Sequence, residues 1–80
     1  MRIKILLFGI TRDIIGDNSI EIELTSGISV MGLQQILKKK YSGLNDIENF
    51  AVAVNEEYAS GEYTINKNDV IAIIPPVSGG

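Results

Sequence analysis

The apolar run at residues 70–74, Val-Ile-Ala-Ile-Ile, constrains the fold of this chain more than any other segment. A nearly continuous apolar strand is typical of the centre of a sheet, where neighbouring elements cover both of its faces. Pro75 and Pro76 follow directly, and proline cannot continue a central strand because it lacks a backbone N–H. The sequence therefore predicts a central strand at residues 70–74, from which the chain departs in an extended conformation.

The rest of the pattern predicts further strands and one main helix. Residues 2–8 and 19–24 begin with alternating apolar and polar side chains, which indicates strands with one buried face. The helix is expected to begin after Ser29, a suitable N-cap, because apolar residues then recur at spacings of three or four up to Tyr41. Weaker signals predict a helical turn or loop at 10–15, connecting chain at 44–49, strands at 50–54 and 57–59, and turn-rich chain at 60–68.

These elements fit one small α+β domain. A chain of 80 residues can bury one core, and one helix covers one face of a mixed sheet in a two-layer arrangement. We expect the first and last strands to pair in parallel at the centre of that sheet. The expected organisation is a domain over residues 1–74, followed by an extended tail over residues 75–80.

The composition excludes most self-contained enzyme chemistry. The chain contains no cysteine and no histidine, which excludes thiolate nucleophiles, the common zinc sites and the usual neutral-pH base. The ten carboxylates are scattered without metal-ligand spacing, so we expect neither a bound metal nor a bound cofactor. A net charge of −3 disfavours nucleic acid and favours a basic partner surface. The absence of a signal peptide and of a long apolar run predicts a cytoplasmic protein without a membrane partner.

The tail Pro75-Pro76-Val77-Ser78-Gly79-Gly80 carries the most information about function. Its last two residues have no side chain, so the tail can enter a channel only as wide as a backbone and deliver its α-carboxylate to the active site of another protein. The alternative is a frayed terminus, since chain ends are often disordered. A stiff Pro-Pro exit from a central strand favours the first interpretation.

With these pieces, the sequence resembles the small subunits of molybdopterin synthase, a family of ubiquitin-like sulfur carriers with the β-grasp fold. The resemblance extends over the whole chain. The matching pieces are residues 3–8, residues 12–16, Ala53-Val54-Asn55, Asn68-Asp69-Val70 and the Pro-Pro-Val-Ser-Gly-Gly end.

The resemblance implies a mechanism in which all catalytic groups belong to partner proteins. An adenylating, E1-like enzyme uses ATP to activate the carboxylate of Gly80, and a sulfur donor system converts it to a thiocarboxylate. The tail then enters the large subunit of molybdopterin synthase and donates sulfur to a cyclic pyranopterin precursor, which builds the dithiolene. The resemblance also implies a heterotetramer with that large subunit.

The resemblance assigns partner contacts to Phe8, Arg12, Tyr58 and Ile74. The strand pattern agrees in part, because Phe8 and Ile74 fall on the opposite face from Ile3, Ile5, Ile71 and Ile73. Two large apolar side chains on an uncovered sheet face suggest an interaction patch. The alternative is a second minor core beneath residues 60–68. The sequence departs from the family at Ile74, usually Phe, at Tyr58, usually a smaller apolar residue, and at Asp13, usually Glu.

Other functions remain open at this point. A carrier for another pathway, such as thiamine thiazole synthesis or tRNA thiolation, would share the fold and the Gly-Gly end. A plain β-grasp binding module, whose tail takes no part in chemistry, is the alternative from a different class. The Pro-Pro exit and the segment around Arg12 argue against the thiazole type.

Overall fold

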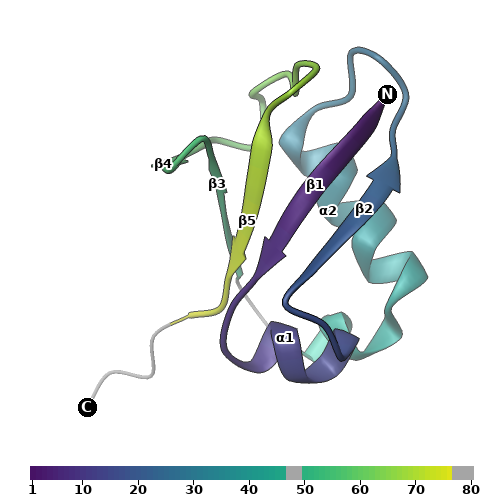
Figure 1. Ribbon diagram of the computed structural model, residues 1–80, viewed down its shortest axis with the longest axis vertical. Helices are drawn as coiled ribbons and strands as arrows, with labels where there is room; N and C mark the ends of the chain where they lie inside the picture. Colours follow the sequence, from purple (N-terminus) through teal and green to yellow (C-terminus); the bar gives the residue numbers. More distant parts are fainter. Residues whose placement is uncertain (47–49, 77–80) are drawn as a thin grey trace.

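The computed structural model describes residues 1–46 and 50–76, and these form a five-stranded mixed sheet with α2 packed on one face (Figure 1). The strand order is β2-β1-β5-β3-β4. The elements are β1 (Arg2–Leu7), α1 (Ile10–Ile15), β2 (Ser19–Glu23), α2 (Val30–Lys40), the 3-10 helix η1 (Ser42–Asp46), β3 (Ala51–Val54), β4 (Glu57–Tyr58) and β5 (Val70–Ile74).

The central pair confirms the expected β-grasp arrangement. Strands β1 and β5 run parallel, with Ile5 opposite Ile71 and Leu7 opposite Ile73. Strand β5 also pairs antiparallel with β3, so it lies between two neighbours as its apolar sequence predicts. Several strand ends differ from expectation by one residue, since β1 stops at Leu7, β2 stops at Glu23, β3 begins at Ala51 and β4 ends at Tyr58.

Helix α2 closes the core from one side of the sheet. The Ser29 hydroxyl accepts a hydrogen bond from the Gly32 backbone N–H at 3.1 Å, which confirms the predicted N-cap. The buried residues of α2 are Val30, Leu33 and Leu37, and they belong to the same core as Ile3, Ile5, Ile71 and Ile73.

Two short helices lie in segments whose sequence pattern is weak. Helix α1 has six residues and is capped at its C-terminus by Gly16, whose φ of 87° places it in the left-handed region. Helix η1 occupies part of the segment expected to be connecting chain, and its Leu44 is fully buried. An isolated apolar residue in a polar segment gives no periodicity, so this element was missed.

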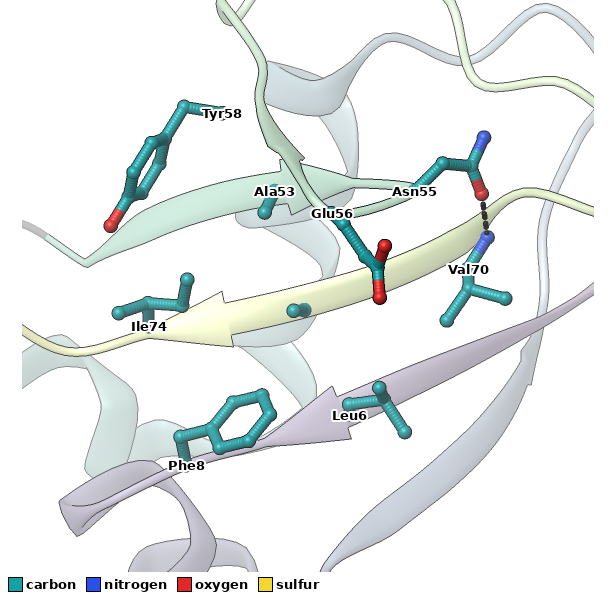
Figure 2. A pocket seen from close by; sticks show the side chains of 9 residues that line it. Leu6, Phe8, Ala53, Asn55, Glu56, Tyr58, Val70 and Ile74 are labelled. Carbon is teal, nitrogen blue, oxygen red and sulfur yellow. Dashed lines mark hydrogen bonds between the residues drawn. The ribbon is translucent and has the colours of Figure 1, made fainter.

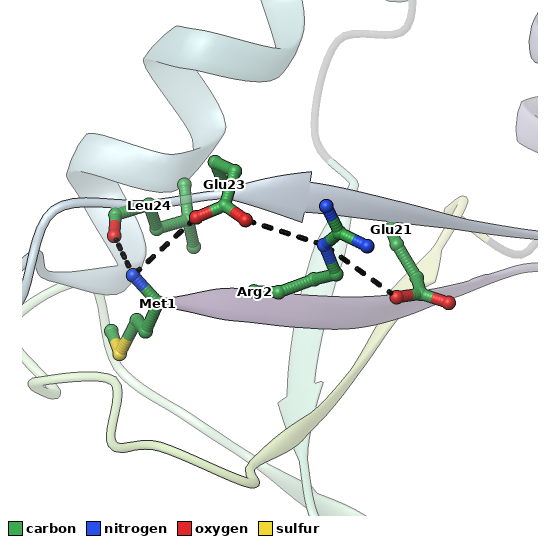
Figure 3. A network of polar contacts seen from close by, with 5 residues as sticks. All are labelled: Met1, Arg2, Glu21, Glu23 and Leu24. Carbon is green, nitrogen blue, oxygen red and sulfur yellow. Dashed lines mark hydrogen bonds and ion pairs between the residues drawn. The ribbon is translucent and has the colours of Figure 1, made fainter.

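The outer edge of the sheet at β2 is held by backbone pairing and by surface charges. Figure 3 shows Arg2 on β1 beside two carboxylates of β2, with Nε 3.2 Å from Glu23 Oε1 and 3.9 Å from Glu21 Oε2. Exposed ion pairs of this kind contribute only about 0–1 kcal/mol. In the described part of the chain, no helix is long and apolar enough to cross a bilayer.

Candidate functional site

The face of the sheet opposite α2 carries a band of apolar side chains. Alternation places Ile5 and Leu7 of β1 in the core. Leu6, and Phe8 just after the end of β1, face the other way. On β5 the same alternation buries Ile71 and Ile73 and leaves Ile74 half-buried on the open side. Face parity therefore predicts this open face correctly.

These side chains form a groove of about 620 Å³. The groove is hollow at its centre because two small residues, Ala53 and Ala72, pair directly across β3 and β5 and leave space between larger side chains. Larger residues continue the same row on both sides, since Leu6 pairs with Ala72 and Tyr58 pairs with Ala53. Figure 2 shows the nine lining residues, which are Leu6, Phe8, Ala53, Asn55, Glu56, Tyr58, Val70, Ala72 and Ile74.

Phe8 is exposed on the groove yet held firmly by its backbone. The fully buried hydroxyl of Thr11 donates to the Phe8 carbonyl at 2.6 Å and accepts from the Phe8 N–H at 3.1 Å. The Phe8 side chain is 47% exposed, and that of Tyr58 is 75% exposed. Two large aromatic rings therefore remain in contact with solvent on a rigid sheet, as is typical of interface anchors.

The β3–β4 hairpin forms one wall of the groove. Its two turn residues have positive φ, 51° at Asn55 and 73° at Glu56, as in a type I′ turn. Asparagine tolerates this conformation, whereas a left-handed residue with a long side chain costs about 1–2 kcal/mol. This turn joins the strands expected at residues 50–54 and 57–59, and Glu56 is its strained position.

Asn55 ties this hairpin to the beginning of β5. Its backbone N–H donates to the Val70 carbonyl at 2.8 Å, and its side-chain Oδ1 accepts from the Val70 N–H at 2.9 Å. Its Nδ2 donates to Asp69 Oδ1 at 2.9 Å. Beyond the end of β3, the Asn55 side chain thus takes the place of a backbone partner for β5. Its hydrogen bonds hold the hairpin turn beside the groove.

The Asp69 carboxylate is the buried acceptor of this network. Besides Asn55, it accepts hydrogen bonds from the Tyr63 hydroxyl at 3.1 Å and from the Asn66 N–H at 2.8 Å. Burial raises the pKa of Asp69, but the hydrogen bonds from Asn66, Asn55 and Tyr63 outweigh it and hold the pKa below the ordinary value. Asp69 therefore stays ionised, and it stabilises the hairpin as a charged acceptor.

The structure brings three of the predicted contact residues, Phe8, Tyr58 and Ile74, to this one groove. Arg12 lies on α1, where its side chain is exposed, and it does not line the groove. The predicted partner contact at Arg12 therefore stays a prediction. The alternative of a minor core beneath residues 60–68 is wrong. That loop instead bonds to the start of α2, through Val30 N–H to the Tyr63 carbonyl and Met31 N–H to the Gly61 carbonyl, both at 2.9 Å.

The chain leaves the groove at Pro75, which follows Ile74. Gly9, just after β1, has a φ of 57°, and a Cβ built on it would lie 3.0 Å from Pro75 Cγ. The proline ring therefore lies against the end of β1 because Gly9 has no side chain there. Pro76 is exposed, and the predicted tail residues Val77, Ser78, Gly79 and Gly80 lie outside the described residues.

Sequence reasoning missed several residues of the site, namely Ala53, Ala72, Glu56 and Asp69. Ala72 did carry a signal, because it is the one small residue within an otherwise bulky strand. The contacts of Asp69 join it to Asn55, which is 14 residues earlier in the chain. A pattern read over short windows does not contain that pairing.

Sequence comparisons match this chain to a known family and to several relatives. The sequence pattern described as the ThiS family matches residues 5–80. The molybdopterin synthase sulfur carrier subunit of Dictyostelium discoideum is 46% identical over 81 residues, which cover 96% of this chain and 94% of that protein.

Solved structures share the fold. SAMP1 from Haloferax volcanii, 20% identical, superposes with a TM-score of 0.85 and covers 100% of both chains. A chain in the complex of subunits 1 and 2 of the molybdopterin-converting factor from Helicobacter pylori is 26% identical, with a TM-score of 0.70 and coverage of 100% of both chains.

Proposed function

Because this chain belongs to the ThiS family, we propose that it serves as the sulfur carrier subunit of a molybdopterin synthase. The α-carboxylate of Gly80 attacks ATP on an adenylating partner, and pyrophosphate leaves. A sulfur donor then displaces AMP from the acyl-adenylate, which gives a thiocarboxylate. Within the large subunit, this thiocarboxylate donates sulfur to a cyclic pyranopterin precursor.

The single observation that carries this proposal is the position of the groove relative to the tail. Ile74 lines the groove, and the next residue, Pro75, begins the exit. A partner that covers Phe8, Tyr58 and Ile74 is therefore next to the root of the tail. An extended run of six residues spans at most about 21 Å, so the partner's active site must lie within that reach of the groove.

The division of labour follows from the chain's own chemistry. A chain without cysteine or histidine has neither a thiolate to carry sulfur nor an ordinary neutral-pH base. Adenylation compensates for this, because it turns an unreactive carboxylate into an acyl electrophile without any side chain of the carrier. The large subunit and the adenylating enzyme supply the catalytic groups, and this chain supplies a docking face and a reactive end.

Intact-mass spectrometry tests the proposal. The purified chain is incubated with the adenylating enzyme, ATP and a sulfur donor, and a parallel sample lacks ATP. We expect a mass gain equal to sulfur replacing one oxygen, located at Gly80 by fragmentation and absent without ATP. Adding the large subunit and the pyranopterin precursor should restore the original mass as molybdopterin forms. No ATP-dependent mass gain would contradict the carrier function, and a mass gain that the large subunit cannot reverse would point to a carrier for another pathway.

A further inference from the structure

Glu56 is an unusual residue for the wall of an apolar groove. Among the described residues that line it, Glu56 is the one carboxylate, and the others are mostly aliphatic or aromatic. Figure 2 shows its side chain extending from the hairpin over the sheet, with the carboxylate above β5 between Ala53 and Val70. The charge therefore lies on the groove surface that a partner would cover.

The backbone at Glu56 gives no structural reason for this residue. With φ at 73°, it occupies the second turn position, where type I′ hairpins favour glycine. The neighbouring Asn55 fits its own left-handed conformation and makes the hydrogen bonds that hold the turn. Strain at an outlier position that the fold does not need is a reason to look for a function.

Among the described residues, no cation forms an ion pair with the Glu56 carboxylate. The ion pairs formed within residues 1–46 and 50–76 involve the amino terminus, Arg2, Glu21 and Glu23, and none involves Glu56. Lys4 lies opposite Val70 in the sheet register, and it forms no ion pair with Glu56 either. In the free protein, water solvates this carboxylate.

Docking of a partner would change the solvation of the Glu56 carboxylate. A partner seated on Phe8, Tyr58 and Ile74 removes water from the groove, and an unpaired carboxylate left in an apolar interface is strongly unfavourable. We infer that Glu56 pairs with a cationic side chain of the large subunit and so determines which partner fits the groove. This inference rests on the proposed function. Arginine suits the position best, because its planar fork binds a carboxylate through two hydrogen bonds.

The test compares two neighbouring charges in one hairpin, Glu56 in the turn and Glu57 on β4. Glu56→Gln removes the charge and keeps the size and the strained backbone. Glu57→Gln is the matched control, because Glu57 is exposed on β4, carries the same charge and does not line the groove. Binding of each purified chain to the purified large subunit is measured by calorimetry at low and at moderate salt.

We expect Glu56→Gln to weaken binding about tenfold or more at both salt concentrations, as for a desolvated charge pair, which salt screens little. Glu57→Gln should change the affinity less than about twofold, as for a rim charge. The arginines and lysines of the large subunit are then replaced one at a time. For the residue that pairs with Glu56, the replacement and Glu56→Gln together should weaken binding no more than either change alone.

Other results would overturn the inference. Equal affinity of wild type and Glu56→Gln at both salt concentrations would show that Glu56 turns to solvent in the complex. If Glu56→Gln weakened binding to the adenylating enzyme but not to the large subunit, Glu56 would contact the adenylating enzyme, and the inference would be wrong. A wild-type chain that does not bind the large subunit at all would overturn the proposed function, and the inference with it.

Discussion

Leu7 and Phe8 are adjacent in the chain, yet they belong to different parts of the molecule. Leu7 is 3% exposed and packs in the core beneath α2, whereas Phe8 is 47% exposed on the groove. The alternation of β1 separates the two side chains, and Thr11 fixes the backbone at the point where β1 ends. One residue thus contributes to stability, and we assign its neighbour to binding.

Substitution of these neighbours by alanine should separate the two roles. Phe8→Ala should weaken binding to the large subunit about tenfold, the usual loss for an interface anchor, and leave thermal unfolding nearly unchanged. Leu7→Ala should destabilise the fold by about 2–5 kcal/mol, as for a core leucine. Thermal unfolding and a binding titration of both variants check this. A large loss of stability in Phe8→Ala with unchanged affinity would show that Phe8 belongs to the core.

Asp69 should make the stability of the fold depend on pH. Its pKa is lower in the folded protein than its ordinary value of 3.8, so its stabilising effect is complete above that pH and disappears as pH falls through the folded pKa. At pH 7, Asp69→Asn should be less stable than wild type by about 1–3 kcal/mol. The asparagine has no charge to strengthen these hydrogen bonds, and its NH₂ group would face groups that are themselves donors.

Denaturant unfolding across pH measures this effect. The difference between wild type and Asp69→Asn should be largest above pH 5 and should shrink at pH values below about 3.8. Asp17→Asn is the control, because Asp17 is exposed and should show no such difference. A difference between wild type and Asp69→Asn that is constant from pH 7 to pH 2 would contradict the ionised role of Asp69.

At the scale of elements, the parts predicted well are those with local signals. Strand β5 follows from a single apolar run, and α2 follows from Ser29 and the spacing of Leu33 and Leu37. The open face was also predictable, because alternation within β1 and β5 fixes which way Phe8 and Ile74 point.

The shape of the site could not be predicted in the same way. The groove floor exists because Ala53 lies opposite Ala72, and that register is set by pairing between strands far apart in the sequence. The acceptor role of Asp69 likewise depends on Asn55 reaching it across the sheet end. Such contacts appear only once the whole fold is assembled, and no local pattern contains them.

The β3–β4 hairpin should become more stable when its strained residue is replaced. Glu56→Gly should raise the free energy of unfolding by about 1 kcal/mol, because glycine accepts the left-handed conformation and completes the Asn-Gly pattern of type I′ turns. The same variant should bind the large subunit more weakly, since the carboxylate is lost. Urea unfolding beside a binding titration checks both effects. Unchanged or lower stability would contradict the strain assigned to Glu56.

At the scale of the whole molecule, α2 covers one face of the sheet, and the described residues leave much of the other face uncovered. The core lies between α2 and the sheet, and residues 60–68 close its edge at the start of α2. The open face remains available for a partner, and the tail departs from its central strand. In the proposed function, the fold presents this groove for docking and, directly beside it, the root of the tail.

Removal of Gly79 and Gly80 tests this account most directly. Full-length and shortened chains are each combined with the adenylating enzyme, ATP, a sulfur donor, the large subunit and the pyranopterin precursor, and molybdopterin is quantified. We expect product only from the full-length chain, while the shortened chain keeps its thermal unfolding and its affinity for the large subunit, because the groove and the core are intact. Molybdopterin formation by the shortened chain at the full-length rate would contradict the claim that the tail carries the sulfur.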